Sequence, residues 1–186
     1  MTGRRETGGD GTSATDDAVL VNGRIQLRPH DPCWEELYAV EAARIRSTLG
    51  PTAVSVDHVG STAVPGLSAK PIIDILLTVG DSTDEESFVP QLETVGYVFH
   101  LREPAWYEHR LLKRVDPPVN LHVFSDGCEE VDRMLAFRDR LRDSPDDRVR
   151  YETAKRSLAT QRWRRVQDYA DAKSEVIAEI LDVNDG

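Results

Sequence analysis

The sequence predicts an α/β (α+β) protein in which a mixed sheet forms first and helices follow it. Two observations support this class. Short apolar or alternating segments, typical of strands, fill the chain up to about Phe124. Helical periodicity then runs from about Glu129 to the C-terminus without a return to alternation. The chain has 186 residues, 39% of them hydrophobic, which is enough for one domain with a substantial core.

The N-terminal part of the chain divides into a tail and the start of a domain. Residues 1–18 carry Gly, Thr, Asp and Arg with no large apolar side chain after the initial methionine, which predicts a disordered tail. The domain would therefore span residues 19–186. Its first element is a short edge strand between Val19 and Leu27. A helix is expected from about Asp31 to Leu49, where a Gly-Pro pair ends it.

The rest of the chain alternates strand and helix signals before it becomes helical. Strands are expected at 53–59, 72–79, 97–101, 108–115 and 119–124, and helices at 85–95, 130–142, 147–161 and 163–182. The last two helices are either separate or continuous. The segment 72–79 is the strongest strand, because a β-branched apolar run of this length is typical of a strand that is buried on both faces.

Asp74 lies inside that apolar run, between Ile73 and Ile75. A buried carboxylate is costly unless a cation, a metal or several donors compensate it, and such groups cluster at functional sites. We therefore interpret Asp74 as the functional centre. The alternative is a structural carboxylate that caps the loop of residues 60–69.

The stretch around this acid resembles the GrpB family. The matching positions are His58, Gly60-Ser61-Thr62, Val64-Pro65-Gly66-Leu67, Ala69-Lys70-Pro71 and Asp74. Weaker matches run from Leu27 to the last helix. The resemblance implies a nucleotidyltransferase-like fold. It also implies an enzyme that binds a nucleoside triphosphate with Mg²⁺ and transfers a nucleotidyl group to a small acceptor.

In nucleotidyltransferase folds, a Gly-Ser turn at the position of Gly60 and Ser61 holds the triphosphate. Glycine lets the backbone approach an anion closely, and backbone N–H groups and hydroxyls can donate to phosphate oxygens. The resemblance thus implies phosphate binding by Gly60, Ser61 and Thr62, with Ser68 and Lys70 nearby. The alternative is a tight turn that only directs the next strand. The Gly-Lys-Ser/Thr junction of a P-loop does not occur in this stretch.

The metal-binding pattern of this fold is incomplete in the sequence. Such enzymes usually place two carboxylates one residue apart on the second strand, where both can hold Mg²⁺. Here the pair would be Asp74 and Leu76, so one carboxylate remains, and the GrpB pattern shares this departure. Glu41, on the inward stripe of the helix 31–49, and His122 are the candidates to complete the metal shell. His122 is also a candidate general base, or else a satisfied structural histidine.

Three basic residues lie on the apolar stripes of the C-terminal helices, namely Arg138, Lys155 and Lys173. Long basic side chains are seldom fully buried without a partner. Together with Asp74 they predict an anion-binding cleft, and all three also match the GrpB pattern. The alternative is structural: the cations pair with Glu41 or Asp74, or extend to the surface.

Composition narrows the classes of partner. The net charge of −10 disfavours non-specific binding to nucleic acid and to anionic membranes. No apolar run is long enough to span a bilayer, and no signal-peptide core follows the N-terminal arginines, so we expect a cytoplasmic protein. Besides a transfer enzyme, two functions stay open: a non-catalytic nucleotide- or phosphometabolite-binding module, and an interaction domain without a ligand.

Overall fold

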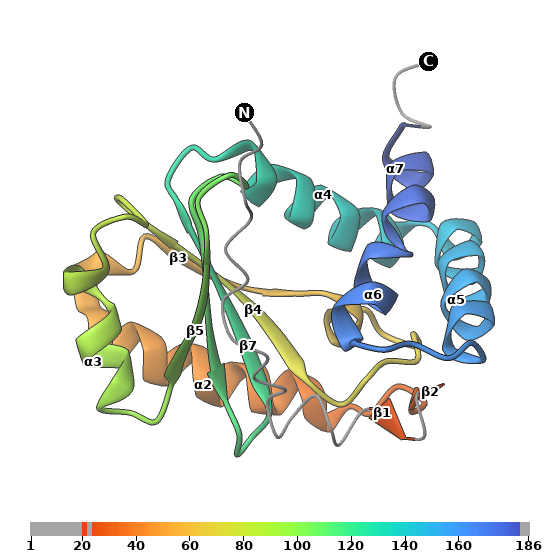
Figure 1. Cartoon of the computed structure of the whole chain (residues 1–186), viewed down its shortest axis with the longest axis horizontal. Helices are drawn as coiled ribbons and strands as arrows, with labels where there is room; N and C mark the ends of the chain where they lie inside the picture. The colour runs from red at the N-terminus through yellow and green to blue at the C-terminus, as the bar shows by residue number, and fades with distance from the viewer. Residues whose placement is uncertain (1–19, 22–23, 183–186) are drawn as a thin grey trace, which may run out of the picture.

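The fold is a five-stranded mixed sheet with helices on both faces (Figure 1). The computed structural model describes residues 20–21 and 24–182, so the predicted tail of residues 1–18 lies outside the described part. The strand order is β3-β4-β7-β6-β5. β4 and β7 pair in parallel, whereas the other neighbours are antiparallel. The predicted α/β class with a mixed sheet is thereby confirmed.

The five strands predicted from residue 53 onward are all found, with small shifts at their ends. They are β3 (Ser55–Val59), β4 (Ile73–Val79), β5 (Val98–Glu103), β6 (His109–Arg114) and β7 (Val119–Ser125). The long helices are α2 (Cys33–Leu49), α4 (Glu129–Asp143) and α5 (Pro145–Ala159), followed by the shorter α6 (Val166–Asp171) and α7 (Ser174–Asp182). The helical C-terminus is therefore also as expected.

Three elements differ from the prediction. The expected edge strand is instead a separate pair of short strands, β1 (Leu20–Val21) and β2 (Arg24–Ile25), which bond to each other. The expected helix 85–95 becomes a 3₁₀ turn, Glu85–Ser87, and then α3 (Val89–Glu93). Pro90 causes this division, because proline fits the first helical turn but not the interior of a longer helix.

The third difference concerns the last predicted helix, 163–182. It is divided into α6 and α7, and Lys173 lies between them rather than on a continuous helical stripe.

Among residues 20–21 and 24–182, no helix combines the length and apolarity needed to cross a bilayer.

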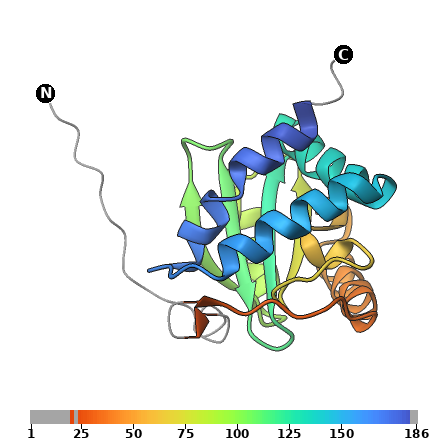
Figure 2. The same ribbon diagram turned by 90° about the vertical axis from the view of Figure 1, so that its right-hand side faces the viewer.

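The two faces of the sheet are covered by different parts of the chain. Ile73 and Ile75 of β4 share one buried cluster with Ile45 of α2, whereas Leu76 packs in another cluster with Met134 of α4. Figures 1 and 2 show α2 and α3 together on one side of the sheet and the helices from α4 onward on the other. Since side chains alternate along a strand, Asp74 faces the same side as Leu76, toward the C-terminal helices.

Candidate functional site

Asp74 is partly buried at the start of β4. Its Oδ1 accepts a hydrogen bond from Nδ2 of Asn120 on β7 at 2.9 Å, and Nε2 of His122 lies 3.8 Å from the same oxygen. The side chain keeps 28% of its surface exposed, so a ligand can reach it. Burial opposes its ionisation, but His122, Lys70 and Asn120 outweigh burial and hold the pKa of the Asp74 carboxyl below its ordinary value. Asp74 is therefore a carboxylate at neutral pH.

The loop that follows β3 packs directly on this carboxylate. Gly60 has φ of 69° and ψ of −170°, a conformation that only glycine adopts readily. A Cβ atom added at Gly60 would lie 2.5 Å from Oδ2 of Asp74. The structure therefore brings the Gly-Ser turn and the strand acid into contact.

Lys155 of α5 lies at the C-terminal end of this loop. It is 2% exposed, and its ammonium group donates to the backbone oxygen of Ser68. Burial, the main cause, together with the nearby positive charges of Lys173 and Lys70 lowers the pKa of Lys155 to about 7, although Glu152 acts in the opposite direction. A concentration of positive charge that already disfavours protonation of one lysine would favour an anionic ligand.

Tyr169 of α6 lies among the same lysines. The ammonium nitrogen of Lys173 is 4.9 Å from the centre of its ring, and that of Lys70 is 5.9 Å away. The Tyr169 hydroxyl is buried and has no hydrogen-bond partner in the described part of the chain. A buried donor of this kind is costly unless a partner accepts from it, and a phosphate oxygen would do so.

Two further residues join the loop to this charge cluster. Burial raises the pKa of the Tyr151 phenol, and Asp74 adds to this effect while Ser61 opposes it, so Tyr151 lies close to both. Burial also lowers the pKa of Lys173, and the charge of Asp74 partly restores it. We call this group the Asp74 site; its members are Gly60, Ser61, Lys70, Asp74, Tyr151, Lys155, Tyr169 and Lys173.

Two residues that were not predicted from the sequence, His109 and Glu103, continue a line of hydrogen bonds from His122. Nδ1 of His122 is 3.1 Å from Nε2 of His109, and Nδ1 of His109 is 2.8 Å from Oε2 of Glu103. His109 is 3% exposed at its side chain, since it stacks on Phe124. These residues come from β5, β6 and β7, so only the pairing of the strands brings them together. The alternating pattern within each strand does not predict that these three side chains meet.

The predicted role of Glu41 as a metal ligand is wrong. Glu41 belongs to α2, on the face of the sheet opposite Asp74. Its side chain is fully buried and accepts hydrogen bonds from the Tyr97 hydroxyl at 2.9 Å and from Nε of Arg44 at 3.2 Å. Glu41 is thus a structural acid. In the described ranges, no group of three potential His, Cys, Asp or Glu ligands lies close enough together to hold a metal ion.

Two residues that were predicted to bind phosphate, Arg138 and Thr62, make other contacts in the structure. Arg138 is turned toward β3, where it forms ion pairs with Asp139 at 2.7 Å and Asp57 at 3.7 Å. Its charge is therefore neutralised, as the structural alternative proposed, although by different acids. The Thr62 hydroxyl is buried and bonds to Nε2 of His58 at 3.0 Å, so it is already engaged within the protein.

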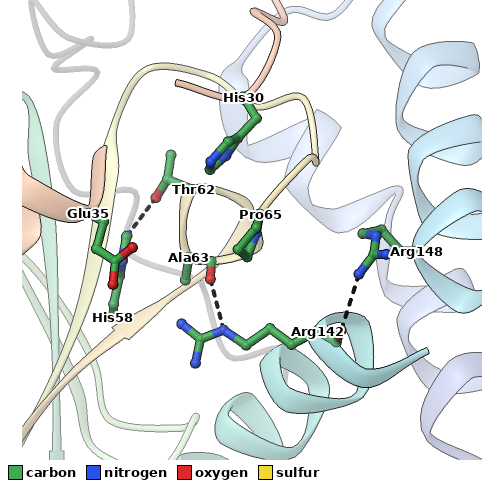
Figure 3. A pocket seen from close by; sticks show the side chains of 8 residues that line it. All are labelled: His30, Glu35, His58, Thr62, Ala63, Pro65, Arg142 and Arg148. Carbon is green, nitrogen blue, oxygen red and sulfur yellow. Dashed lines mark hydrogen bonds between the residues drawn. The ribbon is translucent and has the colours of Figure 1, made fainter. Parts of the chain in front are cut away.

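A separate pocket of about 340 Å³ lies on the other side of the loop (Figure 3). His58, Thr62 and Arg142 are among its lining residues. Nε of Arg142 donates to the backbone oxygen of Ala63 at 2.9 Å, which fastens α4 to the loop. Burial lowers the pKa of His58 to about 4, so this histidine is neutral at physiological pH. The pocket thus contacts the loop at Thr62, Ala63 and Pro65, and none of its lining residues belongs to the Asp74 site.

Comparison with known proteins agrees with the resemblance seen in the loop. The family model described as GrpB protein matches residues 24–183. The chain belongs to the GrpB family. Among GrpB relatives, UPF0157 protein BH1888 of Halalkalibacterium halodurans is 58% identical over 160 residues, which cover 86% of this chain and 82% of that protein.

GrpB structures and longer proteins also match. The crystal structure of conserved protein GrpB from Enterococcus faecalis aligns with a TM-score of 0.72 at 30% identity, over 85% of this chain and 98% of that one. A protein of Mycolicibacterium paratuberculosis named dephospho-CoA kinase is 33% identical over 164 residues, which cover 74% of this chain and 40% of that protein. The GrpB region is therefore only a part of that longer protein.

Proposed function

We propose that this GrpB protein binds a nucleoside triphosphate at the Asp74 site and transfers its nucleotidyl group to a small acceptor. The observation that carries the proposal is the approach of Lys70 and Lys173 to the ring of Tyr169, whose buried hydroxyl has no hydrogen-bond partner among the described residues. The charge of Lys155 lies close to both lysines. The phosphates would lie between these donors and the Gly-Ser turn. Lysines supply compact positive charge, and Ser61 supplies a hydroxyl.

Magnesium would enter this site with the triphosphate rather than occupy a prepared site. The described residues offer one carboxylate here, Asp74, which is too few for a resident ion of this kind. Bound phosphates and water would have to supply the other oxygen ligands. Asp74 would then hold and orient the nucleotide, and His122 would receive the acceptor hydroxyl. We expect this chemistry in the cytoplasm, where nucleotides are available.

A second candidate function follows from the same shortage of carboxylates. Leu76 occupies the position of the usual second acid and is fully buried against α4. The domain would then bind a nucleotide or another phosphorylated metabolite without turning it over. The lysines and Tyr169 serve this function equally well, so only a measurement of turnover separates the two.

The first experiment tests binding. Purified protein is titrated with ATP, GTP, CTP and UTP in the presence of Mg²⁺, and the melting temperature is followed. At least one nucleotide should raise the melting temperature at concentrations below a few millimolar. Failure of all four at these concentrations would contradict the transfer function and would restrict the second candidate function to phosphorylated metabolites other than these nucleotides.

The second experiment separates transfer from binding. Asp74→Asn keeps the shape of the side chain but removes its charge, and Asp84→Asn, in an exposed loop, is the matched control. If the protein is a transfer enzyme, Asp74→Asn lowers pyrophosphate release by at least roughly 100-fold and nucleotide affinity stays equal or increases. If wild-type protein binds nucleotide but releases no pyrophosphate with any acceptor tested, the binding module is the correct function.

A further inference from the structure

A chain of hydrogen bonds connects the Asp74 site to the protein surface. It begins at His122, whose Nε2 faces Asp74, and passes through His109 to Glu103. The side chain of His109 is 3% exposed, that of His122 is 22% exposed, and that of Glu103 is 46% exposed. His109, in the middle, is thus shielded from water, and the outer carboxylate of Glu103 is in contact with it. We call these three residues the histidine chain.

The Glu103 carboxylate, at the outer end of the histidine chain, determines which ring nitrogens of His109 and His122 carry protons. A neutral imidazole has one N–H and one lone pair, and an ionised carboxylate can only accept. Glu103 therefore requires a proton on Nδ1 of His109, which leaves Nε2 of His109 as an acceptor. Nδ1 of His122 must then carry the next proton. When His122 is neutral, this leaves a lone pair on its Nε2, the nitrogen that faces Asp74.

A second arrangement satisfies the same hydrogen bonds in the opposite direction. If Glu103 is protonated, it donates to Nδ1 of His109, Nε2 of His109 donates to Nδ1 of His122, and Nε2 of His122 carries a proton toward Asp74. One proton moves across each link to convert the first arrangement into the second. Neither imidazole becomes charged in either one, so the chain can carry a proton through a buried region without a charged intermediate.

The surroundings of the chain favour this behaviour. Burial, the main cause, together with the positive charges of protonated His122 and of Arg110 lowers the pKa of His109 to about 3, so His109 stays neutral. Burial and the nearby Asp171 raise the pKa of Glu103, although His122 opposes them, which makes Glu103 a better proton acceptor than an ordinary glutamate. Phe124 and Trp106 pack on the His109 ring and keep it in place.

We infer that Glu103, His109 and His122 form a proton relay that removes the proton of an acceptor hydroxyl bound beside Asp74. This inference rests on the proposed function for its substrate.

The acceptor oxygen forms a bond to the α-phosphorus, and pyrophosphate leaves with the electron pair of the broken P–O bond. The hydroxyl proton passes to Nε2 of His122, the Nδ1 proton of His122 passes to His109, and the Nδ1 proton of His109 passes to Glu103, which returns it to water. His122 is the catalytic residue of this step, and His109 and Glu103 act through it.

The experiment changes only the outer end of the relay and observes the inner end. Protein labelled with ¹⁵N at its five histidines is studied by long-range ¹H–¹⁵N correlation spectra, which show which ring nitrogen carries the proton. In the wild type, His109 and His122 should both carry it on Nδ1. Glu103→Lys replaces an acceptor by a donor, so both rings should change to the Nε2–H form. Glu36→Lys makes the same charge change at an exposed position of α2, on the other face of the sheet, and should leave both rings unchanged.

A purely structural role for these residues predicts a different result. Residue 103 does not touch His122, so a His122 tautomer that ignores Glu103→Lys would overturn the relay. A turnover measurement adds a second readout. Glu103→Gln still accepts from His109 but cannot take up the proton, so pyrophosphate release should fall by about 10² or more while nucleotide affinity stays the same. Equal turnover in Glu103→Gln and wild type would also overturn it.

The two proposals fail in different ways. If no nucleotide binds but the His122 tautomer follows residue 103, the proposed function is wrong and the hydrogen-bonded relay stands as the path for some other donor. If nucleotide binds and is turned over, but the tautomer and the turnover are both insensitive to residue 103, the relay is wrong and the proposed function stands.

Discussion

Two carboxylates occupy opposite faces of the same sheet, and they are held in different ways. Glu41 is fully buried and bonds to Tyr97 and Arg44, with Arg114 at 3.9 Å. Asp74 is partly exposed. Among the described residues it accepts a hydrogen bond from Asn120 and lies 3.8 Å from Nε2 of His122, with the charges of Lys70 and Lys173 nearby. A satisfied acid stabilises the fold, whereas an incompletely satisfied acid beside a group of cations is available to a ligand.

The largest expected effect separates these two acids by stability. Glu41→Ala removes the partner of a buried hydroxyl and of two arginines, so the free energy of unfolding should fall by roughly 3–5 kcal/mol. Asp74→Ala should cost only about 1 kcal/mol, because water can reach the groups left behind. Denaturant unfolding of the two variants measures the difference. An equal or larger loss for Asp74→Ala would mean that Asp74 is the structural acid.

The next effect concerns the contact between the loop and Asp74. Gly60→Ala both strains the backbone and places a Cβ atom 2.5 Å from Oδ2 of Asp74, so it should cost about 3 kcal/mol. Gly66→Ala is the matched control, since Gly66 has φ of 81° but a Cβ atom there would contact nothing within 4 Å. Gly66→Ala should therefore cost about 1–2 kcal/mol. Equal losses of unfolding free energy in the two variants would show that the contact with Asp74 is unimportant.

The sequence predicted those parts of the molecule that depend on neighbouring residues. The β4 strand could be recognised because its residues are apolar on both faces, and the contact of Gly60 with Asp74 follows from one loop and one strand. Lys155 and Lys173 could be recognised as unusual because they interrupt apolar stripes. In each case the signal lies within a single segment.

Other parts of the site depend on how distant segments pair. Glu41 lies on an inward stripe just as Lys155 does, but the sequence does not state which face of the sheet its helix covers. Arg138 looked equally available, yet its neighbour Asp139 and Asp57 of β3 neutralise it. His109 and Glu103 gave no signal at all, because their role arises only when β5, β6 and β7 lie side by side.

A third prediction uses the contrast between the two kinds of cation. Lys173→Met should weaken binding of a nucleoside triphosphate by about tenfold, since one positive charge near the phosphates is lost. Arg138→Met should leave the affinity within about twofold of wild type, because this arginine already pairs with Asp139. Calorimetric titration of both variants gives the comparison. A loss confined to Arg138→Met would move the phosphate site from Asp74 to the edge of β3.

The smallest effect is a pH dependence that comes from Lys155. Its pKa of about 7 means that the folded protein without ligand carries this proton on about half of the molecules at pH 7. An anionic ligand stabilises the protonated amine and raises this pKa, so binding takes up a proton. Affinity therefore changes little below pH 7 and decreases above it, by about fivefold between pH 7 and pH 8.

Lys155→Met is the control for this prediction, because the ligand has ionisations of its own in the same range. The variant should bind more weakly at every pH, and the ratio of wild-type to variant affinity should decrease from pH 7 to pH 8. Titration calorimetry in two buffers of different ionisation enthalpy measures the proton uptake directly. A ratio that stays constant across this range would show that Lys155 keeps its charge throughout, so the lysine would act as a permanently charged donor that holds the loop at Ser68 and not as a group that responds to the ligand.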